Sequence, residues 1–160
     1  MKISGLQKVG ILRKVKLDKQ VNSHSSCKIE MLYTGDNISE LQRYIGTEIT
    51  VEDDARRLMR GRIESITVNQ SFSNSTVVFY VYSFSMEADK ITYNRAFQDT
   101  KKNYSDIISC LKNDRVSFQI LERSLAEEKK DSIVFQHNCT DFELAKKIAS
   151  SRNLYLFIDD

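Results

Sequence analysis

The residues of this sequence that could do chemistry are few and far apart. His137 and Cys139 form a His-x-Cys pair, and both residue types are common zinc ligands. A tetrahedral zinc site needs four ligands, but no second histidine or cysteine pair lies nearby, and the other histidine is His24. The pair therefore predicts an exposed or hydrogen-bonded histidine rather than a metal site.

The acidic residues offer no clearer site. Glu52, Asp53 and Asp54 could surround a cation, yet they lack the alternating oxygen ligands and the glycine of a calcium-binding loop. We interpret them as a turn. The sequence also lacks the glycine-rich phosphate-binding motifs and the nucleophile-elbow motif. We therefore expect no catalytic residue, no metal and no cofactor, and a protein that is not an enzyme.

The three cysteines are odd in number and widely spaced, at Cys27, Cys110 and Cys139. This pattern predicts reduced thiols, as in the cytoplasm, rather than a disulfide framework. Cys110 lies beside the apolar stripe of a predicted helix, and we expect its side chain in the core.

One apolar stretch, residues 76–86, predicts the strongest strand of the chain, buried on both sides near its start. Its aromatic residues are Phe79, Tyr80, Tyr82 and Phe84. Aromatic residues on a strand could stack the bases of single-stranded nucleic acid. Residues 77–85 carry no charge, however, so a core or subunit-contact strand is the favoured interpretation. A monomeric β-barrel module that binds nucleic acid or another ligand is the alternative function.

Size and composition set the broad class. The chain has 160 residues, of which 41% are hydrophobic, and a net charge of +2, which gives no strong case for a polyanionic partner. These values indicate one or two small globular domains. No apolar run reaches the roughly 18 residues of a membrane span, and the basic N-terminus lacks the apolar core of a secretory signal.

The C-terminal stretch, residues 131–160, predicts a strand, a helix and a second strand. The first strand covers residues 133–136. Thr140 precedes Glu143 by three positions, the spacing of a capping box at the start of a helix. The helix has an apolar stripe that includes Phe142, Ala145 and Ile148. Residues 154–158 are largely apolar and predict the closing strand.

The earlier part of the chain predicts mostly strands. Strands are expected at residues 27–33, 48–52, 58–68 and 116–121, with one or two more before residue 21, where Leu12 breaks the alternation. A short helix is expected from Ile38 to Gly46, and an amphipathic helix at residues 103–112, capped by Asn103 or Thr100. The charged residues 125–130 predict an exposed turn.

Three blocks of residues resemble a known family. Residues 136–149 (QHNCTDFELAKKIA) are similar to the segment Q-x-x-E-[ST]-D-[FW]-x-F-x-x-[RK]-[LI]-A of phage tail baseplate hub proteins, which include the late-control D proteins and the hub part of type VI secretion VgrG proteins. Cys139 replaces the usual Glu and Leu144 the usual Phe. Any polar contact of that Glu is therefore in question.

The other two blocks lie before residues 136–149 in this chain, in the same order as in the family. Residues 45–51 (IGTEITV) and 59–63 (MRGRI) resemble the family's I-G-x-x-[IV]-x-V and x-x-G-x-I patterns. Residues 95–98 (RAFQ) and 104–108 (YSDII) resemble its R-x-[FY]-Q linker and the following helix. The glycines of the first pair, Gly46 and Gly61, suit barrel corners, where close backbone approach leaves no room for a Cβ.

The resemblance implies an α+β fold: a hub-like β-barrel, a helix, and the strand–helix–strand start of a second barrel. The implied domains are 1–92, the first barrel; 93–130, a connecting helix and strand; and 131–160, the start of the second barrel. A hub continues through a complete second barrel, so this chain is expected to be a fragment or an abbreviated version.

The implied function is structural. Three hub subunits form a ring that joins the tail tube to the spike in a phage or prophage tail, or in a contractile injection machine. The implied partners are two further copies of the chain, a tail tube and a spike. The expected location is the cytoplasm during assembly and then the baseplate. Phage and secretion system remain open alternatives.

Overall fold

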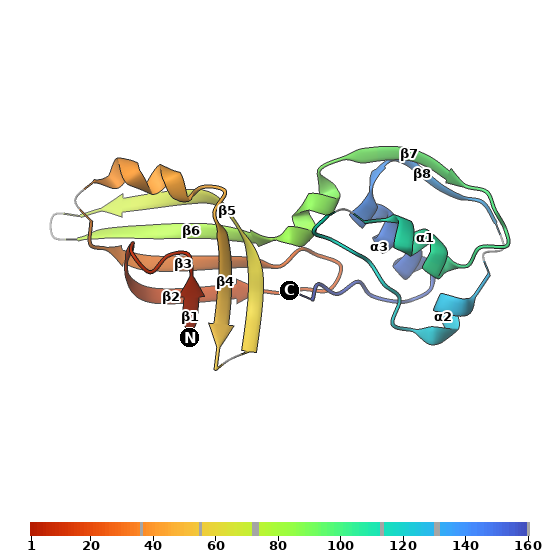
Figure 1. The fold of residues 1–160 in the computed structure, drawn as a ribbon, viewed down its shortest axis with the longest axis horizontal. Coiled ribbons are helices and arrows are strands. Elements are labelled where there is room, and N and C mark those ends of the chain that lie inside the picture. The colour runs from red at the N-terminus through yellow and green to blue at the C-terminus, as the bar shows by residue number, and fades with distance from the viewer. Residues whose placement is uncertain (36, 55, 72–73, 113, 130–131, 160) are drawn as a thin grey trace. The chain divides into compact units, whose positions relative to one another are not determined.

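The computed structural model describes residues 1–35, 37–54, 56–71, 74–112, 114–129 and 132–159. The chain forms two compact units (Figure 1). The first contains Met1–Phe84 together with the residues from Ile158 onward, and the second contains Ser85–Phe157.

The first unit is built on one antiparallel sheet. Its elements are β1 (Lys2–Ser4), β2 (Gly10–Asp18), β3 (Ser26–Tyr33), the 3₁₀ helix η1 (Ile38–Tyr44), β4 (Glu48–Asp53), β5 (Arg56–Gln70) and β6 (Ser75–Ser83). The strands pair in the order β1-β4-β5-β6-β3-β2 and the sheet curls (Figure 1). Among the described residues, β1 and β2 are the two end strands of the sheet, and the outer edge of each has no partner strand. The expected barrel is therefore a curled half-barrel.

The aromatic strand lies in the middle of this sheet, as its two-sided burial predicts. β6 pairs with β5 on one side and with β3 on the other. Phe79 is fully buried on the concave core side, next to Ile29 of β3 and Ile66 of β5. Val78 is only 5% exposed although it faces the other side. Both faces of β6 are thus covered near its start.

Two features of the sequence mark irregularities in this sheet. Leu12 interrupts the alternation of β2, and the register of β2 against β3 shifts between Leu12 and Lys14. Gly61 of β5 lies where a Cβ would come within 2.1 Å of the Tyr82 carbonyl oxygen, which is the expected close approach. Gly46 has open space around it but a φ of +82°, so backbone conformation explains that glycine.

The second unit combines a two-stranded sheet with short helices. Its elements are the 3₁₀ helix η2 (Phe84–Asp89), β7 (Thr92–Phe97), α1 (Tyr104–Cys110), α2 (Arg123–Glu127), β8 (Val134–Thr140) and α3 (Asp141–Ser151). β7 and β8 pair antiparallel. The stripes predicted for α1 and α3 form one core, in which Ile107, Leu111, Leu144 and Ile148 are buried. Asn103 caps α1 with a capping box, which decides between the two predicted caps.

Three predicted elements of this unit are wrong. Residues 116–121 form no strand, and residues 154–158 are not paired with any described strand. The side chains of residues 154–157 still alternate between buried and exposed positions. Leu154 and Leu156 pack on the core, while Tyr155 and Phe157 are exposed. Periodicity thus predicted the alternating burial correctly, but a strand also needs a hydrogen-bonding neighbour. The predicted turn at residues 125–130 overlaps α2, which Glu122 caps by accepting a hydrogen bond from the Ser124 amide.

The prediction for Cys110 is also wrong. Cys110 is exposed, whereas Cys27 and Cys139 are buried, and all three thiols are free. At 3.6 residues per turn, Cys110 lies roughly 110° around the axis of α1 from the centre of the apolar stripe, which is formed by Tyr104, Ile107, Ile108 and Leu111. Its thiol donates a hydrogen bond to the Asp106 carbonyl oxygen at 3.2 Å instead.

Candidate functional site

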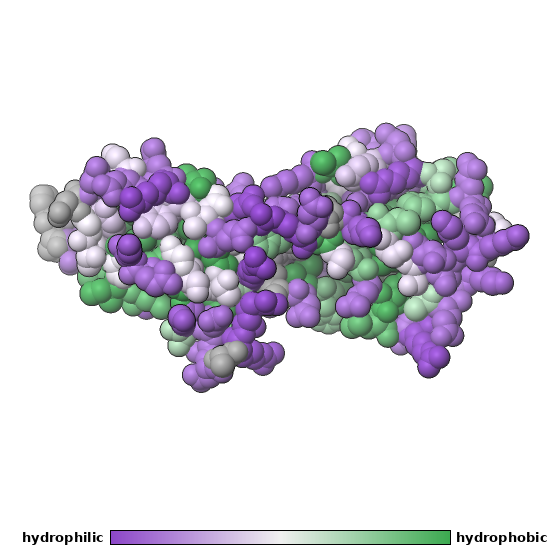
Figure 2. Space-filling model, in the orientation of Figure 1, coloured by the Kyte–Doolittle hydropathy of each residue, from purple (hydrophilic) through white to green (hydrophobic). Residues whose placement is uncertain are grey.

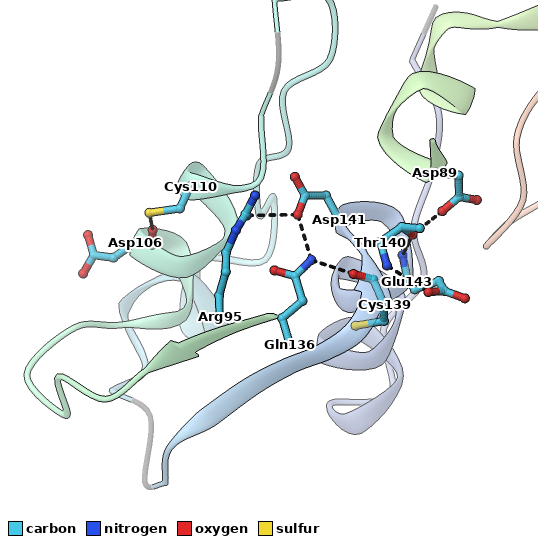
Figure 3. Close-up of polar contacts among 9 residues, drawn as sticks. All are labelled: Asp89, Arg95, Asp106, Cys110, Gln136, Cys139, Thr140, Asp141 and Glu143. Carbon is cyan, nitrogen blue, oxygen red and sulfur yellow. Dashed lines mark hydrogen bonds and ion pairs between the residues drawn. The ribbon is translucent and has the colours of Figure 1, made fainter. Parts of the chain in front are cut away.

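Two of the three sequence blocks meet in a polar network of the second unit. Arg95 of β7 donates a hydrogen bond to Asp141 at the start of α3, at 3.0 Å (Figure 3). The amide of Gln136 in β8 donates to the same carboxylate oxygen at 2.9 Å and to the Cys139 carbonyl oxygen at 3.1 Å. Gln136 is 1% and Asp141 6% exposed. Asp141 thus joins β7, β8 and α3.

The helix cap lies beside this network. Thr140 accepts a hydrogen bond from the Glu143 amide at 3.1 Å, and Glu143 accepts one from the Thr140 amide at 2.9 Å, which confirms the predicted capping box. The Thr140 hydroxyl donates its own proton to the carboxylate of Asp89 in η2 (Figure 3). Thr140 therefore ties the start of α3 to η2 as well.

This geometry gives the quoted residues a structural role. Position 139 contributes its backbone carbonyl oxygen to the network, while the Cys139 thiol packs in the core, so the substitution for Glu leaves these contacts intact. Leu144, in place of the usual Phe, is 2% exposed and also fills the core. In this chain, Arg95, Gln136 and Asp141 act by hydrogen bonding between β7, β8 and α3 (Figure 3).

A second set of contacts holds the other end of α3. Arg152, its C-cap residue, donates a hydrogen bond to the Tyr104 hydroxyl at 2.8 Å and pairs with Glu128 at 2.9 Å. Its guanidinium carbon also lies 4.9 Å from the centre of the Tyr104 ring. Both ends of α3 are thus fastened by an arginine.

The residues first considered for chemistry do not come together. His137 is exposed, whereas Cys139 is 3% exposed in the core, because Asn138 between them has a φ of +45°. Among the described residues, no group of three or more His, Cys, Asp or Glu side chains could hold a metal ion. Burial raises the pKa of the Cys27 thiol to about 11, which makes it a poor nucleophile.

The side of the first sheet that faces away from its core carries a group of residues that share one surface. Lys16 of β2 lies opposite Lys28 of β3, and Lys28 lies opposite Tyr80 of β6. The Lys28 ammonium nitrogen is 5.6 Å from the centre of the Tyr80 ring. Tyr82, two positions along β6, is 38% exposed. We call Lys16, Lys28, Tyr80 and Tyr82 the lysine–tyrosine face.

Sequence reasoning missed this face because it considered charge only along the aromatic strand. Residues 77–85 carry no charge, but the neighbouring strands bring lysines alongside the tyrosines. The signal that could have found it is the polar alternation of β2 and β3, combined with the register of their hairpin. That register depends on the shift near Leu12, which the sequence alone does not fix.

Comparison with known proteins identifies the fold. No protein-family profile and no curated protein sequence matches the chain. Among solved structures, it is similar to the c3393 protein of E. coli, with a TM-score of 0.68 and 14% sequence identity. That protein is described as a component of the type VI secretion system with structural similarity to the T4 bacteriophage tail proteins gp27 and gp5. The two chains share a fold.

The structural match covers the two chains to different extents. It covers 97% of this chain and 47% of that one, so the present chain spans about half the length of its neighbour. The fold is mostly β, with a curled half-barrel sheet and few helices, and the predicted resemblance is confirmed at the level of this fold. The second barrel stays a prediction. None of the helices in the described ranges has the length and hydrophobicity that a membrane crossing needs.

Proposed function

We propose that this chain is a structural component of the baseplate hub of a phage tail or a contractile injection machine. The observation that carries the proposal is the fold, which matches a type VI secretion component over 97% of the chain. Three copies would form a ring that joins a tail tube to a spike. The proposed role includes no catalysis. Assembly would take place in the cytoplasm, before incorporation into the virion tail or the injection baseplate.

The contacts within each unit suit a rigid structural component. Each unit has its own hydrophobic core. In the second unit, ion pairs and hydrogen bonds join β7, β8 and α3 through Asp141, and α1 and α3 through Arg152. Such contacts hold the elements in one arrangement, because breaking a half-buried ion pair leaves a charge without its partner.

The second unit also offers surfaces for assembly. Hydrophobic residues reach its surface (Figure 2), and Phe135 is 63%, Tyr155 67% and Phe157 72% exposed. Its sheet has only two strands among the described residues, so β7 and β8 each keep an edge that no described strand covers. Uncovered strand edges and exposed aromatic side chains both favour pairing with another chain.

Sedimentation at rising protein concentration tests the proposal. We expect a weak self-association, in which the mass grows toward three subunits as the concentration increases. Phe135→Ser combined with Phe157→Ser should shift this equilibrium toward the monomer. Ile11→Ser is the matched control, because Ile11 is 62% exposed but belongs to the first unit. A strict monomer at every concentration would contradict the ring.

A further inference from the structure

We propose that the lysine–tyrosine face binds single-stranded nucleic acid, with a base stacked on Tyr82 and phosphates held by Lys16 and Lys28. This inference goes beyond the hub role and does not depend on it. It rests on the charge, the aromatic residues and the shape of one surface of the first unit.

The first argument is the placement of charge. Lys16 and Lys28 are direct cross-strand partners, and like charges in that position destabilise a sheet. An anion between the two ammonium groups would remove this repulsion. A shallow groove on this face is lined by both lysines and by Asp18. Asp18 accepts a hydrogen bond from the Gln20 side chain at 3.1 Å and offsets one of the two positive charges. The groove therefore keeps an excess positive charge, which suits a phosphate.

The second argument is the position of the tyrosines among basic residues. Lys28 lies opposite Tyr80 on one side, and Arg62 of β5 lies opposite Tyr82 on the other. The Tyr80 ring contacts Lys28 and so positions its ammonium group, while Tyr82 is 38% exposed. Aromatic side chains on a central strand, flanked by basic groups, form the platform on which single-stranded bases stack.

The third argument is the size of the groove. It measures about 170 Å³ and is lined chiefly by Lys16, Asp18, Ser26, Lys28, Tyr80 and Tyr82. Pockets that enclose a small molecule typically hold about 300–1,000 Å³. The groove is therefore too small and too open to enclose a free ligand, but it can receive one unit of a polymer that continues across the sheet.

The combination favours nucleic acid over an acidic protein segment. Carboxylates would pair with the lysines but make no use of the exposed Tyr82 ring. Duplex DNA would supply phosphates but keep the faces of its bases stacked and out of reach. A single strand provides both groups at once.

Fluorescence anisotropy of a labelled oligothymidylate, titrated with the whole chain at several salt concentrations, tests the proposal. We expect binding that weakens as salt increases. Lys16→Gln with Lys28→Gln should reduce the slope of log K against log salt by about 1.4, since each phosphate contact on a single strand contributes roughly 0.7. Lys14→Gln is the matched control, because Lys14 lies on the same strand opposite Glu30.

Variants of Tyr82 test the stacking separately. Tyr82→Ala should lower the affinity roughly 5- to 150-fold, whereas Tyr82→Phe, which keeps the ring, should bind like the natural chain. Circular dichroism and thermal melting establish that each variant is folded.

Three outcomes would overturn the proposal: no binding at low salt, equal losses for Lys14→Gln and the lysine pair, or equal competition by polyglutamate. The last would indicate an acidic protein partner. None of them bears on self-association, which sedimentation without oligonucleotide measures independently.

Discussion

Arg95 of β7 and Asp141 of α3 form an ion pair of 3.0 Å although they lie 46 positions apart in the chain. The Asp141 side chain is 9% and the Arg95 side chain 31% exposed, so water screens the pair only in part. The stacking of Arg95 on Tyr93, at 3.6 Å from its ring centre, further fixes the guanidinium. This pair links the segment after the first unit to the start of α3.

A double-mutant cycle on this pair should show strong coupling. We expect Asp141→Ala to cost about 1.5–3 kcal/mol, because it removes a charged acceptor from both Arg95 and Gln136. The coupling energy between Arg95→Ala and Asp141→Ala should exceed about 1 kcal/mol. Unfolding in urea measures these free energies.

The chain contains a matched control for that cycle. Arg123 and Glu127 form an ion pair of the same length, 3.0 Å, but their side chains are 90% and 68% exposed. Their coupling should stay at about 0.3–0.5 kcal/mol. Equal coupling in the two pairs would show that the Arg95–Asp141 contact is no more than a surface ion pair.

The N-terminus of α3 allows a second prediction. Thr140→Ala should cost about 1–2 kcal/mol, since it removes the helix cap and also the donor to Asp89. Ile148→Ala should cost more, about 2–5 kcal/mol, because Ile148 is 5% exposed in the core. Thr140→Ser keeps both hydrogen bonds and is the control. Equal urea midpoints for the two alanine variants would mean that α3 is not packed as described.

The sequence predicted the elements whose signal is local. The capping box of α3 follows from two residues at fixed spacing, Asn103 was one of the two caps expected for α1, and the apolar stripes define the faces that are buried. Similarly, Leu12 marks the irregularity in β2 because a break in alternation changes the side of the sheet that a side chain faces.

Apart from Cys110 and the helix α2, which are local, the misses depend on partners distant in the chain. Residues 154–158 have the pattern of a strand but no paired neighbour among the described residues. The lysine–tyrosine face exists only because three strands place Lys16, Lys28 and Tyr80 in one row. The sequence did not predict the contact between Arg95 and Asp141 either, although both residues belong to blocks that resemble the hub family. Long-range pairing, rather than propensity, decides these features.

Gly61 provides a third prediction. Gly61→Ala should destabilise the chain by about 1–3 kcal/mol or more, because the new Cβ would come within 2.1 Å of the Tyr82 carbonyl oxygen and push β5 away from β6. Ser65→Ala, an exposed change on the same strand, should remain within about 0.5 kcal/mol of the natural chain. If the melting temperatures of both variants coincide, β5 and β6 do not approach as closely as this.

The last prediction concerns alkaline pH. Burial raises the pKa of Cys27 from 9.0 to about 11, so the folded chain holds this proton after the unfolded chain has released it. The contribution of the neutral thiol to stability is complete below about pH 9 and is lost as the pH rises toward 11. Urea unfolding between pH 8 and 11 should therefore show a steeper loss of stability for the natural chain than for Cys27→Ala. The exposed Cys110 provides the control, and Cys110→Ala should follow the natural chain. Parallel pH profiles for all three proteins would show that the Cys27 thiol ionises as readily in the folded chain as in the unfolded one.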